Sequence, residues 1–429
     1  MTPAHRSFRV LRRKLTSGVR SNILKLSLAG PRKEGVDWQK SERLASLFTL
    51  FVNAAHTNKM NAWPDRRIQE LFRIEHPIIQ APMANSALAA LAIGAAQGGG
   101  LGSLGCASLS PERIREEVAH FREATRQPLN LNFFCHRPPR HDHGRESNWK
   151  RLLMPYYDEL GLDASAPAPA SARSPFDETA AGLVEELRPE IVSFHFGLPD
   201  KTLFNRVRAS GARIVSSATT VEEARWLEGR GCDAIIAQGA EAGGHRGMFL
   251  AQEIAAQVGT MALVPQIVDA VKVPVIAAGG IGDSRGIAAA FALGAAAVQI
   301  GTAYLFCPES TISPLHRAAL LSAREDQTML TNIFTGRPAR GIANRIVREL
   351  GPLSGAVPDF PLAGGMLVPL QKADPARSDF MPLWSGQAAR LGRECPAAEL
   401  TVCLANEALA RLSRSFEHEQ PDGSPRFGR

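Results

Sequence analysis

Two glycine-rich segments carry the residue types that bind anions through the backbone. Gly279-Gly280-Ile281-Gly282-Asp283 follows one apolar run, and Gln299-Ile300-Gly301-Thr302 follows the next run along the chain. Glycines let backbone N–H groups approach a phosphate closely, above all where a helix begins, and Ser284 is the expected cap of such a helix. The two segments predict a phosphate site at Gly280 and Gly301. The alternative is that these glycines only make tight turns.

A third segment combines glycines with groups that can contact a flat ligand. It reads Gln238-Gly239-Ala240-Glu241-Ala242-Gly243-Gly244-His245. The Gln238 amide both donates and accepts hydrogen bonds, which suits the mixed polar edge of a flavin or a nucleobase, and Asn132 has the same capability. We expect His245 to contact the substrate or an anion. For each amide, a loop residue that bonds to its own backbone is the alternative.

His195 is the candidate general base. It lies in the run IVSFHFG, where strand alternation predicts that the imidazole points away from the face shared by Phe194 and Phe196. An imidazole at the end of a strand can accept a proton near neutral pH. A hydrogen-bonded core histidine is the alternative.

These residues fall at the ends of apolar runs that alternate with helical patterns. The runs cover residues 76–84, 99–105, 129–134, 191–197, 213–219, 234–239, 273–280 and 297–303. Alternating strands and helices predict an α/β fold with a parallel sheet, and eight repeats fit a closed (β/α)8 TIM barrel better than an open sheet. Because the carboxyl ends of barrel strands meet at one face, we expect the candidate residues to come together there.

The chain divides into four predicted segments. They are a basic N-terminal extension that is disordered or lies outside the functional protein (1–59), the barrel (60–312), a C-terminal helical segment packed on the barrel (313–414) and a disordered tail (415–429). Met60 is one candidate for the functional start, because it directly precedes the first ordered pattern. A transit peptide and a basic tail are the alternatives for the extension.

Two further stretches interrupt the barrel pattern. Residues Cys135 to Ala172 are too long for a plain connection between a strand and a helix, so they predict a long loop excursion over the mouth of the barrel after the third strand, a candidate lid. The C-terminal helical segment follows from helical patterns near 314–325 and 396–414. Within it, Thr335 to Arg340 reads only as a basic loop.

The charge distribution restricts the class of partner. The extension holds twelve Lys and Arg and three acids, which gives it a net charge of +9. The formal net charge of the whole chain is +7, so the rest of the chain carries −2. The rest of the chain therefore has no excess of positive charge that would favour binding to nucleic acid. No 18-residue apolar stretch predicts a membrane span, and the six cysteines lack metal-site or disulfide spacing. We expect a cytoplasmic protein with no metal and a small-molecule partner.

One apparent nucleotide motif is rejected. Gly100 to Gly105 matches G-x-G-x-x-G, but the dinucleotide fingerprint requires a preceding strand and a following helix. Here a helical pattern precedes the motif, and the motif itself reads as the second strand.

Several segments, taken in order, resemble the nitronate monooxygenases, formerly called 2-nitropropane dioxygenases. They are IIQAPMA, NLNFF, VSFHFG, QGAEAGGHRG, AAGGIG and QIGTAYLFCPES. The resemblance implies an FMN-dependent TIM barrel that oxidises alkyl nitronates, such as propionate 3-nitronate, with dioxygen to a carbonyl product and nitrite. FMN-type enoyl-ACP reductases share parts of these motifs, so an NAD(P)H-dependent FMN reductase acting on enoyl thioesters or quinones is the alternative. A non-catalytic flavin-binding barrel is a second one, and a homodimer is possible.

The resemblance also implies roles for individual residues. The backbone platform for the isoalloxazine ring would be Ala81, Pro82 and Met83, with polar contacts from Asn132 and Gln238. Ribityl and phosphate contacts would come from Gly243, Gly280, Gln299, Ile300, Gly301 and Thr302. His195 matches the histidine that the family uses at the substrate. This chain departs from the family at Tyr304, where a Phe is often found, in the long excursion and in residues 1–59.

Overall fold

The computed structural model describes residues 62–165, 169 and 173–417, with side chains up to residue 414. The predictions for residues 1–59 therefore lie outside the described residues, as does most of the predicted disordered tail. Helix α15 (Ala397–Glu417) continues to Glu417, past the predicted end of the C-terminal helical segment at 414.

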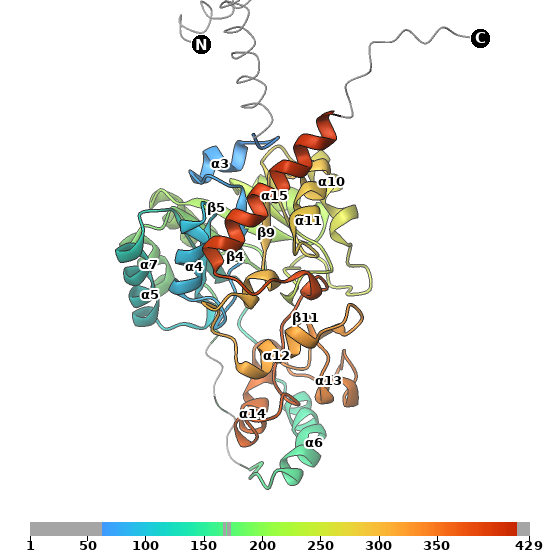
Figure 1. Cartoon of the computed structure of the whole chain (residues 1–429). Coiled ribbons are helices and arrows are strands. Elements are labelled where there is room, and N and C mark those ends of the chain that lie inside the picture. The colour runs from blue at the N-terminus through green and yellow to red at the C-terminus, as the bar shows by residue number, and fades with distance from the viewer. Residues whose placement is uncertain (1–61, 166–168, 170–172, 418–429) are drawn as a thin grey trace, which may run out of the picture. The chain divides into compact units, whose positions relative to one another are not determined.

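Eight parallel strands form the predicted barrel (Figure 1). They are β1 (Ile78–Gln80), β2 (Gly102–Gly105), β3 (Leu129–Phe134), β4 (Ile191–His195), β5 (Arg213–Ala218), β6 (Ala234–Gln238), β8 (Val275–Ala278) and β9 (Ala297–Ile300). The barrel closes between β1 and β2, where the Gln80 N–H donates to the Leu101 carbonyl at 3.0 Å. Each predicted run contains one of these strands, so the α/β class and the TIM barrel are confirmed.

Helices follow the strands and cover the outside of the barrel. They are α4 (Ala89–Gln97), α5 (Pro111–Ala124), α7 (Glu178–Leu187), α8 (Lys201–Ala209), α9 (Val221–Gly229), α10 (Thr260–Ala270) and α11 (Ser284–Ala292). Local sequence explains where they start: at α5, the Ser110 side chain accepts from the Arg113 N–H and Pro111 occupies the first turn. The helix that completes the ring is α15, which packs against α4 and α11. Residues 301–396 are thus an insertion between β9 and its helix.

The core has two layers because strand side chains alternate. Ile79, Val215 and Ile276 point into the barrel, where Ile68 and Phe72 of α3 (Arg67–Phe72) join them. The larger layer lies between the strands and the surrounding helices. The cavity lies at the opposite end of the barrel, where the strands end.

The excursion after β3 and the insertion after β9 build a lobe around a second apolar core. The excursion contains a 17-residue helix, α6 (His143–Glu159), and so is more than a loop. Trp149 and Leu153 of α6 pack with Phe334 and Leu367 of the insertion. Figure 1 shows α6 beside two short helices of the insertion, α13 (Arg345–Glu349) and α14 (Val368–Ala373), with α12 (Pro314–Ser322) between them and the barrel.

The insertion also contributes strands that the sequence did not predict. Strands β10 (Thr328–Thr331) and β11 (Ala339–Ile342) pair antiparallel, and β11 pairs in turn with β7 (Gly244–His245), with Ala339 opposite His245. This three-stranded sheet joins the lobe to the loop that follows β6.

The structure supports the rejection of the dinucleotide motif. Residues Gly102–Gly105 form β2, as expected, and a Cβ on Gly102 would lie 2.3 Å from the Ala92 carbonyl oxygen. The glycine is needed because α4 packs closely on β2. Tyr304 is likewise structural: it is fully buried, and its hydroxyl lies 2.8 Å from that of Thr401 on α15.

The described residues contain neither a membrane-spanning helix nor a metal-binding cluster. No helix in this part of the chain is long and apolar enough to cross a membrane. Within the same residues, no three His, Cys, Asp or Glu side chains are grouped so as to hold a metal ion. The six cysteines are free thiols.

Candidate functional site

A cavity at the carboxyl ends of the strands collects nearly all the predicted site residues. The space within it is about 1320 Å³ when the part open to solvent is counted. The predicted residues that line it are Ala81, Pro82, Met83, Asn132, His195, Gln238, Gly243, His245, Gly280, Gln299, Gly301 and Thr302. Ile300 is not among them. Strand alternation turns its side chain into the core, while the neighbouring Gln299 faces the cavity.

One side of the cavity is a cradle of exposed backbone. Gly279 and Gly280 have φ angles of 108° and 69°, which side-chain-bearing residues rarely adopt. A Cβ on Gly243 would lie 2.5 Å from the Gly386 nitrogen, so the backbone is packed too closely there for a side chain. Thr302 contributes a hydroxyl, whose oxygen accepts from the Gly386 N–H at 2.9 Å and can still donate to a ligand.

The cap of helix α11 differs from the prediction. Asp283, not Ser284, is the N-cap, and its carboxylate accepts from the Arg285 N–H at 2.9 Å. The Ser284 hydroxyl instead donates to Glu407 at 3.0 Å. An anion at this helix terminus would meet a carboxylate, so the backbone available to a phosphate is that of the Gly279–Gly280 and Gly301–Thr302 segments.

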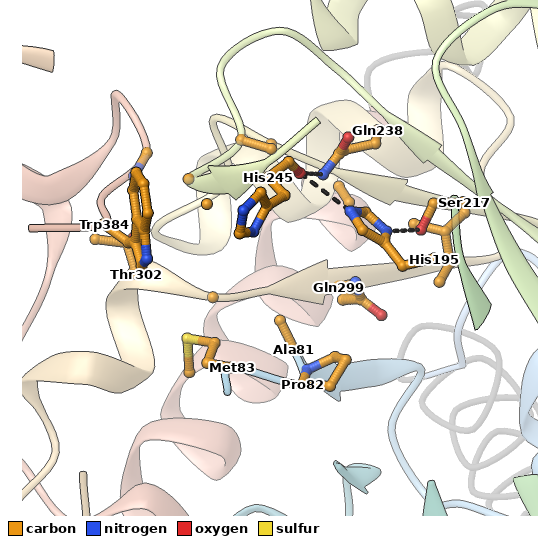
Figure 2. A pocket seen from close by; sticks show the side chains of 18 of the residues that line it. Ala81, Pro82, Met83, His195, Ser217, Gln238, His245, Gln299, Thr302 and Trp384 are labelled. Carbon is orange, nitrogen blue, oxygen red and sulfur yellow. Dashed lines mark hydrogen bonds between the residues drawn. The ribbon is translucent and has the colours of Figure 1, made fainter. Parts of the chain in front are cut away.

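Residues 81–83 form the wall across the pocket from the histidines. Figure 2 shows Ala81, Pro82 and Met83 on one side and His195 and His245 on the other. A Cβ on Gly301 would lie 3.6 Å from the Ala81 Cβ and 3.7 Å from the Met83 sulfur, so this wall adjoins the glycine segment after β9.

The three amides that line the cavity are not equally available. Gln238 donates from Nε2 to the His245 carbonyl at 3.0 Å and accepts the Gly247 N–H at 2.7 Å. Asn132 donates to the Ser193 hydroxyl at 3.0 Å. Gln238 therefore holds the segment around β7, and Asn132 is bonded to the neighbouring strand β4. Gln299 makes no side-chain hydrogen bond within the described residues, which leaves its amide for a ligand.

His195 is held through both ring nitrogens. Nε2 lies 3.1 Å from the His245 carbonyl oxygen, and Nδ1 lies 3.1 Å from the hydroxyl of Ser217, a lining residue that the sequence did not single out. A carbonyl only accepts, so Nε2 carries the hydrogen of the neutral ring and Nδ1 accepts from Ser217. Burial, together with the nearby Arg337 and Arg246, lowers the pKa of His195 to about 3, although the hydrogen bond to the His245 carbonyl acts in the opposite direction.

The aromatic side chains around His195 differ from the alternation prediction. Phe194 stays in the core, but Phe196 has a φ of 71°, which ends the alternation directly after His195. The Phe196 ring consequently lies 4.6 Å from the imidazole, centroid to centroid. With Phe134 and Phe360 it forms an aromatic wall at this end of the site.

The run Thr335 to Arg340 does not line the cavity, but it packs against His245 and the residues around it rather than standing as an isolated basic loop. His245 Nε2 lies 3.0 Å from the Thr335 hydroxyl. The Arg337 guanidinium stacks 3.9 Å from the centre of the Phe196 ring, and Arg340 donates from Nε to the Ala240 carbonyl at 2.8 Å. No local sequence signal reveals these contacts, because they depend on the pairing of β11 with β7.

His245 is set among cations and aromatic rings. Burial lowers its pKa well below the ordinary value, and Arg173, His195, Arg337 and His136 add to the effect. Trp384, which the sequence did not predict as a site residue, lies 5.6 Å from the His245 ring, centroid to centroid. His245 is therefore neutral near pH 7 when the cavity holds no counter-ion.

Comparisons of the sequence identify relatives over most of the chain. The family model described as nitronate monooxygenase matches residues 65–407. Nitronate monooxygenase from Pseudomonas aeruginosa is 42% identical over 349 residues, which cover 80% of this chain and 98% of that protein. The Paraburkholderia phytofirmans enzyme of the same name is 41% identical over 359 residues, covering 82% and 96%.

Solved structures with the same fold also match. Nitroalkane oxidase from Streptomyces ansochromogenes aligns with a TM-score of 0.74 and 35% identity, covering 82% of this chain and 99% of that one. FabK from Thermotoga maritima aligns with a TM-score of 0.63 and 26% identity, covering 82% and 98%.

Proposed function

The chain belongs to the nitronate monooxygenase family of oxidoreductases, and from this premise we propose that it uses FMN and dioxygen to convert small alkyl nitronates, such as propionate 3-nitronate, into a carbonyl product and nitrite. The observation that carries the proposal is one cavity that brings together the glycine backbone of the Gly279–Gly280 and Gly301–Thr302 segments, the wall of residues 81–83 and a neutral histidine pair. Each part matches one requirement of the reaction.

The residues of the cavity fit FMN. The Gly279–Gly280 and Gly301–Thr302 segments offer N–H groups and a hydroxyl to the phosphate, and the wall of residues 81–83 offers a surface for the ring. Gln299 would meet the polar edge of the ring with its unused amide. Bound FMN would supply the redox chemistry, and the protein supplies position and electrostatics.

Charge in the cavity favours an anionic substrate. Glu241 carries the only carboxylate among the described lining residues, and it accepts from the Thr260 N–H at 2.8 Å and the Thr260 hydroxyl at 2.9 Å. Arg173 lines the same cavity, and Arg337 stacks behind Phe196. A nitronate entering the site would meet cations with little opposing charge.

The chain's own residues can hold a nitronate against the ring. His195 stands at the end of β4 in a fixed orientation, since both of its ring nitrogens are hydrogen-bonded. The wall of Phe134, Phe196 and Phe360 excludes water from that end, which strengthens electrostatic interactions with the bound anion. Holding the reactants in one geometry is the larger part of the protein's contribution.

Product analysis tests the proposal. Purified protein should contain FMN, and adding propionate 3-nitronate in air should consume dioxygen and release nitrite without any nicotinamide. Protein that binds FMN and turns over no nitronate would instead be a flavin-binding barrel. Turnover of enoyl thioesters or quinones that requires NAD(P)H would identify the reductase alternative.

A further inference from the structure

We propose that Arg246 and Arg340 stabilise the phosphate of the bound flavin from behind the loop that follows β6. They fix the carbonyl groups of that loop and supply positive charge that the phosphate needs, without touching it. The inference rests on the proposed function, because it concerns the phosphate of FMN. Neither arginine was predicted as a site residue, and neither is among the residues that line the cavity.

Arg246 is a fully buried arginine whose hydrogen-bond partners are neutral. Its guanidinium donates to the Gln238 carbonyl at 2.8 Å, to the Gly239 carbonyl at 2.6 Å and to the side-chain oxygen of Gln257 at 3.0 Å. Among the described residues, none of these acceptors is a carboxylate. Burial and the neighbouring Arg340 lower the pKa of Arg246 to about 10, against the opposing effect of two carboxylates. The side chain therefore stays charged near pH 7.

Arg340 reaches the same loop from β11. Its Nε donates to the Ala240 carbonyl at 2.8 Å, and its Nη1 donates to the Thr328 hydroxyl at 3.2 Å. The residue is 8% exposed, and burial lowers its pKa while Glu241 opposes the shift. Three successive carbonyls at the end of β6, those of residues 238–240, are thus each held by a buried guanidinium.

These bonds decide which groups of the loop face the cavity. In a trans peptide, the C=O and N–H groups point in opposite directions, so the bond from Arg340 to the Ala240 carbonyl turns the N–H of Glu241 away from the arginine. Residues 241–245 line the cavity, whereas the two arginines do not. Within the described residues, the N–H groups of Glu241 and Gly243 have no hydrogen-bond acceptor, so they are available to an anion.

The charge near Gly280 explains why cations are needed behind the loop. Glu241 carries the only carboxylate among the described lining residues, and a Cβ on Gly280 would lie 3.4 Å from the Glu241 Cβ. A phosphate at Gly280 carries nearly two negative charges at pH 7 and would meet this carboxylate. Arg246 and Arg340 both interact electrostatically with Glu241, and their charges are poorly screened because they are buried.

A comparison of two flavins separates this role from a general contribution to the fold. FMN and riboflavin share the ring and the ribityl chain, but only FMN carries a phosphate. The ratio of the riboflavin and FMN dissociation constants therefore measures what the phosphate contributes to binding. The full chain is freed of flavin and titrated with each compound in turn, and binding is followed by flavin fluorescence.

Two substitutions at Arg340 distinguish charge from packing. Arg340→Met keeps the apolar stem of the side chain but removes the charge, whereas Arg340→Lys keeps a charge that can still donate to a carbonyl. We expect Arg340→Met to lower the preference for FMN over riboflavin by about tenfold or more, and Arg340→Lys to keep the preference within about threefold of the wild type.

Arg246→Met should lower the preference for FMN by a similar factor, about tenfold or more. The matched control is Arg115→Met on α5, where the guanidinium is exposed and pairs with Glu186. This variant should leave both dissociation constants unchanged. If Arg246→Met fails to fold, the two substitutions at Arg340 decide the question alone.

Equal losses of affinity for FMN and riboflavin in the methionine variants would show that the arginines only support the fold. An unchanged preference for FMN would show that the phosphate does not sense their charge. Either result would overturn the inference, as would a wild-type protein with no preference for FMN. Failure of the proposed function would look different, because a protein that binds FMN and turns over no nitronate still yields the ratio of dissociation constants.

Discussion

Gly247 leaves the space in which the His195 imidazole stands. A Cβ at this position would lie 2.9 Å from both His195 Cε1 and the Ser217 Cβ. We expect Gly247→Ala to displace the imidazole and to lower kcat/KM for nitronates by about tenfold or more, because small misplacements are costly at a reacting centre. Steady-state kinetics at equal FMN content measure the effect. Gly182→Ala on α7, where a Cβ meets nothing within 4 Å, is the matched control; equal rates in both variants would contradict the expectation.

Gly280 belongs to the proposed phosphate cradle, so a substitution at this position tests whether the phosphate binds there. With a φ of 69°, it occupies a conformation that costs a side-chain-bearing residue roughly 1–2 kcal/mol, and Gly280→Asp also adds a like charge near the phosphate. We expect FMN affinity to fall at least about tenfold, measured by fluorescence titration of the apoprotein. A folded variant that keeps full FMN affinity would show that the phosphate binds elsewhere.

Candidate site residues could be predicted from the sequence where they stand at the end of a barrel strand. Gln299 and His195 were placed at the cavity because parallel strands end at one mouth, and the Ile300 side chain is absent from the cavity lining because it alternates into the core. Ser217 and Thr335 carry no local signal, since their roles come from contacts with histidines far away in the sequence. Such partners become visible only when the chain is folded.

At the scale of elements, Glu223 of α9 fastens the loop that continues from β7. This fully buried carboxylate accepts from the Phe249 N–H at 2.6 Å, the Leu250 N–H at 3.0 Å and the Thr219 N–H at 2.7 Å. Glu223→Gln replaces one of the two carboxylate oxygens with an NH2 group. This group is a donor and cannot accept hydrogen bonds from the backbone N–H groups of the loop. We expect a loss of about 2 kcal/mol in unfolding free energy and faster hydrogen exchange at residues 246–251.

Denaturant unfolding and hydrogen exchange by mass spectrometry measure both effects of Glu223→Gln. Glu222→Gln, the exposed neighbour on the same helix, is the control and should change neither quantity. Unaltered exchange in the loop of the Glu223 variant would mean that other contacts hold it.

Strands and helices with strong periodicity were predictable, and elements defined by distant partners were not. The barrel strands could be predicted because apolar runs alternate with capped helices along the sequence. Strand β11 is four residues long and pairs with the two-residue β7, so neither has a pattern of its own. Helix α6 was missed because its apolar side chains face the lobe core instead of the barrel, within a stretch that reads as an excursion.

For the whole molecule, buried histidines predict acid sensitivity. Burial lowers the pKa of His136 to about 4 and of His195 to about 3. At pH values between these lowered pKa values and the ordinary histidine pKa of about 6.5, the unfolded chain binds more protons than the folded protein. Stability is therefore lost as the pH falls through about 6.5. At pH 5, each histidine lowers the unfolding free energy by up to about 2 kcal/mol.

Unfolding curves at pH 7 and pH 5 measure this dependence. His136→Gln removes one of the titrating groups and should flatten the difference between the two pH values, whereas His120→Gln, at an exposed position, should leave it unchanged. A wild-type protein equally stable at both pH values would contradict the assigned pKa directions.

The most direct test of the central claim is an anaerobic absorbance measurement on the FMN-loaded protein. The claim is that the barrel cavity brings a nitronate to FMN without a nicotinamide. Mixing with propionate 3-nitronate should bleach the oxidised-flavin band, and admitting air should restore the band as nitrite forms, while NADH alone should leave the spectrum unchanged. Rapid bleaching by NADH, with none by the nitronate, would contradict the account and identify the cavity as that of a reductase.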